Sequence, residues 1–306
     1  MRNLIRIHCK RFLFRWETFA VTLLNILLMV IGVLAARLMF DPETMNFDFY
    51  SLIHVITLVS VLAVLTAVIF IEINTLSTGA IRNPLIAGYS KGQVFLSKYI
   101  SVIVFSAVQG AIVLLPTVLA NVWTDRPVSF TLSMLLVYMT VSALAMTVCL
   151  LSDRPTVYVV ILFGVLLGLL FGGTAVSEIL NRPQYQGIEL QEDHIDKLPN
   201  PWYLPSPKRD ILEQAHRLNP MQPLKEYQLY LENFGSYAYT AQYFENTLNQ
   251  AEDDLHREYA GLLKQQWEER YDPHIRRLEL FPYYQCGLLL MIGAGGILLF
   301  RKRNLK

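Results

Sequence analysis

The segment "STGAIRNPLIAGYSKGQVFLSKYI", Ser77–Ile100, lies between two strongly apolar runs and decides how the rest of the chain is interpreted. Two membrane helices can be joined by a few residues, so a polar connection of this length needs an explanation. Asn83 is a good N-cap and Pro84 a good first helical residue, because proline lacks the donor that would be unpaired there. Gly88 can close a helix in the left-handed conformation. The segment therefore predicts a short helix, and we expect it to present Leu85 and Ile86.

A second helix is predicted directly after this glycine. Ser90 and Gln93 have the spacing of a capping box, which starts a helix that continues into the next apolar run. A helix of one or two turns is not stable alone in water, so the first helix must pack on its neighbours or on a partner protein. The segment resembles an apolar anchor with a cationic rim. The anchor is Ile81, Leu85 and Ile86, and the rim is Arg82, Lys91 and Lys98.

The composition of the chain is that of a membrane protein. Of 306 residues, 53% are hydrophobic and only 17% are charged. A helix crosses the bilayer with about 20 apolar residues. Six segments qualify: Thr18–Phe40, Leu52–Ile71, Tyr99–Val122, Phe130–Leu151, Val157–Val176 and Tyr283–Phe300. We therefore expect an all-α integral membrane protein with six transmembrane helices, in which residues 1–176 hold the first five spans and 283–306 the last span and a basic tail.

The distribution of Lys and Arg predicts the orientation. The N-terminal tail has five, residues 77–100 have three and the C-terminus has four, whereas "DPETMNFDFYS" after the first span has none. Cytoplasmic connections carry the excess of basic residues. Both termini and the 80–92 helix are therefore predicted to be cytoplasmic.

The N-terminal tail predicts a helix in the membrane interface. "MRNLIRIHCKRFLFRW" places Ile5, Cys9, Phe12 and Trp16 on one helical stripe and basic residues around the remainder. That pattern suits a helix lying among anionic headgroups.

Residues 177–282 are predicted to form an extracellular helical insertion between the fifth and sixth spans. They contain 18 acidic and 11 basic residues and begin with an irregular proline-rich stretch. Helix starts are predicted at Ser206–Pro207 and near Pro223. From Tyr243 to Tyr271 the apolar spacing predicts one long amphipathic helix, which Pro273 breaks before the last span.

A few small and polar residues inside the spans are candidates for helix packing, a dimer contact or a translocation path. Gly164, Gly168 and Gly172 are four residues apart and share one helix face, where close approach of a second helix is possible. The partner helix belongs either to this chain or to a second copy. Asn25 and Gln109 are polar residues that face protein or a water-filled path in preference to lipid.

No catalytic motif is present in the sequence. The Gly-Lys dipeptide of a Walker A loop is absent, as are a His-Glu-x-x-His pair and a Gly-x-Ser-x-Gly elbow. The three cysteines are too widely separated for a metal motif. Glu72 is expected to be a solvated helix end, with Arg82 or a partner protein as its alternative contact. We therefore expect no enzyme activity, metal or cofactor in this chain.

"GAIRNPLIAGYSKGQVFLSKYI" resembles the segment between spans two and three of bacterial type-2 ABC exporter permeases, in which G-x-I-R-N-x-L-I-x-G-x-S followed by Arg or Lys is common. The basic N-terminal helix, the six spans, the insertion before the last span and "LNPM" are also similar. Pro84 and the long insertion depart from the pattern. In that family the short helix is a coupling helix that docks on a separate ATPase. By resemblance the docking residues are Ile81, Arg82, Asn83, Leu85, Ile86, Gly88, Tyr89, Ser90 and Lys91.

The resemblance implies a permease subunit in the cell membrane of a bacterium. It would pair with a second permease chain, identical or different, and with two ATPase subunits carrying ATP and Mg. Spans one, two and five would line the dimer interface and pathway. The implied substrate is an antimicrobial peptide, a drug or another amphipathic molecule, and nucleic acid is not a partner. The alternative is a complex that does not export and transmits ATPase motion to the extracellular region, for sensing or immunity.

Overall fold

The computed structural model describes residues 1–39, 47–119, 127–152, 154–191, 194–227, 237–251 and 253–303. Within these ranges the protein is mostly helical, and six helices are long and apolar enough to cross a membrane, as predicted. The spanning helices are α2 (Trp16–Met39), α3 (Phe47–Ser77), α5 (Lys91–Leu119), α6 (Pro127–Leu151), α7 (Pro155–Leu180) and α11 (Asp254–Lys302). The other elements are α1 (Arg2–Leu13), α4 (Arg82–Ile86), β1 (Tyr185–Leu190), β2 (Ile195–Pro199), α8 (Lys208–Arg217) and α10 (Tyr237–Asn249). Residues 222–227 are also helical.

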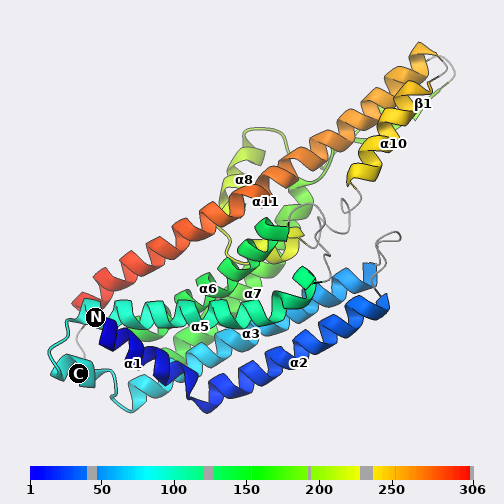
Figure 1. Ribbon diagram of the computed structural model, residues 1–306. Coiled ribbons are helices and arrows are strands. Elements are labelled where there is room, and N and C mark those ends of the chain that lie inside the picture. Colours follow the sequence, from blue (N-terminus) through cyan, green and yellow to red (C-terminus); the bar gives the residue numbers. More distant parts are fainter. Residues whose placement is uncertain are drawn as a thin grey trace.

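Helix α6 forms the centre of the bundle. It packs against α3, α5, α7 and α11, and 72% of its spanning window is buried. The corresponding share for α7 is only 22%, so most of that helix faces away from the chain. Both termini lie at the same end of the bundle, which we call the termini end (Figure 1).

The last helix differs from the prediction. Pro273 was expected to break the chain before the last span, but α11 runs through both Pro273 and Pro282 as one helix of 49 residues. Figure 1 shows it extending far beyond the other spans. Proline removes one backbone donor, and the helix tolerates the loss because its flanking turns are fixed by packing. Leu278 and Phe281, between the two prolines, are fully buried.

The predicted amphipathic helix over residues 243–271 is instead a helical hairpin. Helix α10 ends at Asn249, and α11 begins at Asp254 with Asp253 as its N-cap, whose side chain accepts a hydrogen bond from the His256 N–H at 2.7 Å. The Phe244 ring packs on Trp267 with ring centroids 5.8 Å apart. The apolar stripe thus folds back on itself, which provides the partner surface that an amphipathic helix requires.

Two further details of the insertion correct the sequence analysis. An antiparallel hairpin of β1 and β2 precedes the proline-rich stretch, although only helices were expected in the insertion. Helix α8 begins one residue later than predicted, with Pro207 in the N-cap position. The Ser206 hydroxyl donates to the Asp210 carboxylate at 2.6 Å.

Helix α1 packs on α5 with a face that is rotated from the predicted stripe. Leu4, His8 and Phe12 are its buried residues, and the Phe12 ring lies 5.6 Å from that of Phe105. Trp16, predicted on the same stripe, is 75% exposed. Contact with α5 therefore selects the buried face of α1.

Candidate functional site

Helix α4 connects α3 to α5 at the termini end. A glycine with a positive φ lies in the turn on each side of it. Gly79 has a φ of 65° and Gly88 a φ of 88°, a left-handed conformation that favours glycine. The expected closure at Gly88 is therefore confirmed. The expected cap is not, because α4 begins at Arg82 with Ile81 in the N-cap position and no side-chain cap. Asn83 lies inside the first turn.

The capping box at the start of α5 is confirmed. The Ser90 N–H donates to Gln93 Oε1 at 2.9 Å, and the Gln93 N–H donates to Ser90 Oγ at 3.3 Å. Helix α5 follows immediately, at Lys91. Only four residues therefore separate the end of α4 at Ile86 from the start of a spanning helix.

One face of α4 is anchored and the other is exposed. Ile81 is 4% exposed, and Leu85 and Tyr89 are half-buried against the core. Ile86 is 82% exposed. The two residues expected to be presented together thus point different ways, and Ile86 provides the apolar part of the free face. Its other exposed residues include Arg82, Asn83, Gly88 and Ser90.

The cationic rim is smaller than predicted because Lys98 is buried. Lys98 and Glu72 are 2% and 0% exposed and form an ion pair between α5 and α3. Glu72 was expected to be a solvated helix end, and this expectation is wrong. Lys91 remains near the surface, where its Nζ donates to the Arg303 carbonyl at 2.6 Å.

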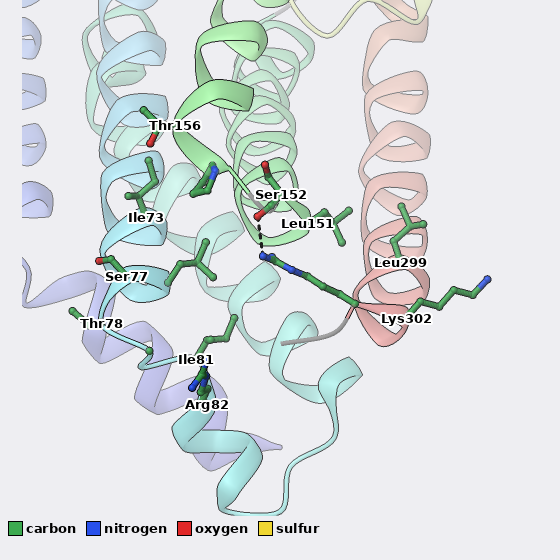
Figure 2. A pocket seen from close by; sticks show the side chains of 14 residues that line it. Ile73, Ser77, Thr78, Ile81, Arg82, Leu151, Ser152, Thr156, Leu299 and Lys302 are labelled. Carbon is green, nitrogen blue, oxygen red and sulfur yellow. Dashed lines mark hydrogen bonds between the residues drawn. The ribbon is translucent and has the colours of Figure 1, made fainter. Parts of the chain in front are cut away.

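A pocket of about 1320 Å³ lies behind α4 (Figure 2). Its walls are the last turn of α3, the start of α4, the junction of α6 and α7, and the last turn of α11. The Arg303 guanidinium reaches into it and donates to the Ser152 carbonyl at 2.8 Å and to the Leu150 carbonyl. We call it the terminal pocket.

Asn25 and Gln109 bond to each other inside the bundle. Asn25 Nδ2 donates to Gln109 Oε1 at 2.8 Å, the Ser60 hydroxyl donates to Asn25 Oδ1 at 2.9 Å, and Gln109 Nε2 donates to Thr22 Oγ1 at 2.8 Å. This network joins α2, α3 and α5. Polar groups satisfied between helices hold membrane helices together.

Gly164, Gly168 and Gly172 do not contact another helix of the described chain. A Cβ added at any of the three would meet nothing within 4 Å. Close helix approach occurs elsewhere, at Gly296, where a Cβ would overlap the Phe95 ring, and at Gly110 beside Tyr138. Spacing alone did not identify Gly110, because a single small residue in an apolar helix carries no periodic signal.

The insertion reaches into the bundle at the end opposite the termini end. The Asn219 side chain donates to the Leu169 carbonyl of α7 at 2.8 Å, and the Leu224 carbonyl lies 3.1 Å from His54 Nδ1 of α3. Leu169 precedes the end of α7 at Leu180 by about 16 Å of helix rise. Residues 219–224 therefore lie beside the spans and not beyond them.

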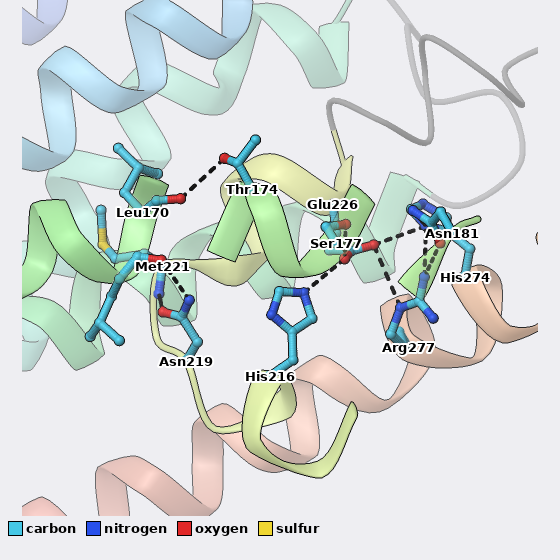
Figure 3. Close-up of polar contacts among 11 residues, drawn as sticks. Leu170, Thr174, Ser177, Asn181, His216, Asn219, Met221, Glu226, His274 and Arg277 are labelled. Atoms are coloured by element: carbon cyan, nitrogen blue, oxygen red, sulfur yellow. Dashed lines mark hydrogen bonds and ion pairs between the residues drawn. The ribbon is translucent and has the colours of Figure 1, made fainter. Parts of the chain in front are cut away.

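A buried polar cluster around Glu226 joins the insertion to α7 and α11 (Figure 3). Glu226 is fully buried, and its carboxylate accepts a hydrogen bond from Ser177 of α7. His216 Nε2 of α8 and His274 Nδ1 of α11 each lie 2.9 Å from one of its oxygens. Arg277 Nε is 3.7 Å away. Sequence reasoning missed this cluster because its members are far apart along the chain.

The surroundings of Glu226 favour its charged form. Burial is the largest single effect and would raise the pKa of this carboxyl group, but the charge of His274 lowers it. Hydrogen bonds from His216 and His274, and the charge of Arg277, act in the same direction. The pKa of Glu226 is therefore held well below its ordinary value.

Among the described residues, no three His, Cys, Asp or Glu side chains are grouped so that they could hold a metal ion. No protein-family model, curated protein or solved structure matches the chain.

Proposed function

We propose that this chain is the membrane-spanning permease subunit of an ATP-driven exporter. The observation that carries the proposal is α4, which is anchored on one face, exposed on the other, and tied by tight corners to two spanning helices. A short helix with an exposed isoleucine at its free face suits docking of another protein, because its own fold does not use that side chain.

The energy for transport comes from a partner in this proposal. The chain has no Walker A motif, so ATP and Mg bind on a separate ATPase subunit. Two such subunits dock on the α4 helices of two permease chains, and their closure moves α4. Because α5 begins directly after the corner at Gly88, movement of α4 tilts α5 and α3 together.

The unpartnered face of α7 supports pairing of two permease chains. Gly164, Gly168 and Gly172 form one face of α7 that has no side chains at these positions, on a helix that is mostly exposed. Small residues four apart permit close contact between membrane helices. The substrate in this proposal is a peptide, drug or other amphipathic molecule that passes between the two copies.

Reconstitution with its ATPase in vesicles tests this function. We expect Ile86→Asp to abolish ATP-dependent accumulation of substrate, because a charge on the docking face removes an apolar contact worth about 2 kcal/mol, or about 30-fold in binding. Leu13→Asp, at an exposed site of α1 at the same end, is the matched control and should transport normally. Equal transport by both variants would exclude α4 as the coupling element.

A second candidate function is transmission of ATPase motion to the outside without export. It is supported by α11, whose 49 residues make a single rod of about 74 Å from the termini end to the external hairpin. Under this alternative, ATP changes protease access to α10 and the start of α11 while no substrate accumulates. Under export, accumulation depends on ATP.

A further inference from the structure

We propose that the terminal pocket binds an anionic phospholipid of the leaflet at the termini end. The chemistry recognised is a phosphate group attached to apolar chains. This inference goes beyond export and requires no ATPase, since every residue that forms the pocket belongs to this chain.

The polar side of the pocket suits a phosphate. Three of its lining residues are cations and none of the described ones is acidic; Asp153 lies outside the described residues. The cations are Arg82 of α4 and Lys302 and Arg303 at the end of α11. Four hydroxyl groups line the pocket, at Ser77, Thr78, Ser152 and Thr156. Those of Ser77 and Thr78 donate to the Asn74 carbonyl, which leaves Ser152 and Thr156 as donors for a ligand. Arginine forks and hydroxyls are the donors that phosphate oxygens accept from.

Ser152 provides independent support for a ligand. This residue is 6% exposed and lines the pocket, and its Oγ has no hydrogen-bond partner among the described residues. Buried hydroxyls are nearly always hydrogen-bonded, so an unpaired one facing a cavity points to an acceptor that is supplied from outside the chain.

The pocket is also lined by apolar side chains. Ile73, Leu76, Leu151 and Leu299 lie among its polar residues, near the ends of spanning helices. At that depth the hydrocarbon region gives way to headgroups. A ligand that fills the pocket must therefore be amphipathic, with its charge toward Arg82 and its chains toward the leucines.

The size and the layout of the cations favour a lipid over a soluble phosphate. The pocket volume of about 1320 Å³ exceeds the range of about 300–1,000 Å³ that is usual for small-molecule sites. In Figure 2, Arg82 and Lys302 lie at separate parts of the rim, and the Lys302 side chain points away from Ser152. Long flexible lysine stems reach headgroups at a membrane surface, so Lys302 adds charge attraction at the edge of the site.

Native mass spectrometry of the full chain in mild detergent tests the inference. We expect phosphatidylglycerol to stay bound at least tenfold better than phosphatidylethanolamine. Replacing Arg82→Gln and Lys302→Gln together should lower the affinity for phosphatidylglycerol about 30-fold, which is about fivefold for each cation removed. Thr156→Trp, which adds bulk to the pocket wall without changing charge, should also weaken lipid retention. The control Arg6→Gln with Lys10→Gln removes two exposed cations of α1 and should have no such effect.

A soluble competitor identifies the source of the phosphate. Glycerol 3-phosphate has the phosphate without acyl chains and is expected not to displace the lipid. Displacement by it would overturn the lipid assignment in favour of a soluble phosphate. Equal retention of both lipids, or phosphatidylglycerol retention that survives both the double variant and Thr156→Trp, would overturn the site itself. The measurement uses the purified chain alone, so its failure is separate from any failure of the proposed export.

Discussion

Glu72 is the residue whose environment differs most from what its sequence position suggests. It stands near the C-terminal end of an apolar run, and hydropathy alone indicates a solvated helix end. Its ion-pair partner, Lys98, lies 26 residues further along the chain, on another helix. Pairing between spans depends on how helices are rotated against each other, and a single sequence does not encode that rotation in any local signal. Gln109 with Asn25 is the contrasting case, since polarity in a span already predicted a protein contact.

The ion pair between Glu72 and Lys98 should stabilise the bundle only as a pair. Glu72→Gln leaves a buried ammonium without its counter-charge, and we expect a loss of about 3–5 kcal/mol in the free energy of unfolding. Adding Lys98→Met removes the orphaned charge and should recover part of that loss. Thermal unfolding in mild detergent measures both variants. A double variant less stable than Glu72→Gln would contradict this interpretation of the pair.

Glu226 should make the contacts between the insertion, α7 and α11 sensitive to acid. Its pKa is held below the ordinary value near 4.3, so its contribution to stability is complete above that pH and is lost as the pH falls toward the folded-state pKa. We expect the unfolding temperature of the wild type to fall from about pH 5 to about pH 3, and Glu226→Gln to fall less steeply. The control is Glu213→Gln, in a less buried pair with Arg217. Identical slopes for wild type and Glu226→Gln would contradict the prediction.

At the scale of elements, the helix ends that depend on residues close together in the chain were predicted correctly. The capping box of Ser90 and Gln93 and the closure at Gly88 formed as their spacing indicated. The errors arose where packing overrides local signals. Pro273 continues a helix because buried side chains fix its flanking turns. The stripe from Tyr243 to Tyr271 folds into a hairpin because its own two halves pack together.

The corner at Gly88 should be essential for the position of α4. Its φ of 88° lies in a region that costs a side chain about 1–2 kcal/mol, so Gly88→Val should displace α4 and reduce ATPase binding by about tenfold. Ala87→Val, at the adjacent exposed residue, is the matched control and should bind normally. Co-purification of the ATPase in mild detergent measures the effect. Normal binding by the Gly88→Val variant would show that the corner does not position α4.

At the scale of the whole molecule, the number of spans and the class of fold follow from hydropathy, whereas their arrangement does not. Six apolar runs predict six membrane helices, whichever way those helices are arranged. The central place of α6 and the exposed place of α7 depend on which faces fit together. The position of residues 219–224 beside α3 and α7 was equally hidden, because the hydrogen bonds of Asn219 and Leu224 connect residues distant in sequence.

Pairing of two copies through α7 should depend on its glycine face. Gly168→Leu should weaken dimerisation at least tenfold, or about 1.4 kcal/mol, because a bulky side chain prevents close helix approach. Gly287→Leu is the matched control, since that glycine of α11 also has nothing within 4 Å. Cross-linking in native membranes measures the dimer. If both variants dimerise as the wild type does, the copies do not meet through this face.

The central claim is that α4 is the docking element for a separate ATPase. A photo-cross-linking side chain at Ile86, with a second at Leu13 as the control, tests it in intact membranes. Both positions are exposed at the same end of the molecule, but Ile86 alone belongs to α4. We predict a cross-linked product from position 86 that contains a Walker A ATPase, and none from position 13. Cross-linking of position 86 only to lipid, while an ATPase still co-purifies with the chain, would contradict it.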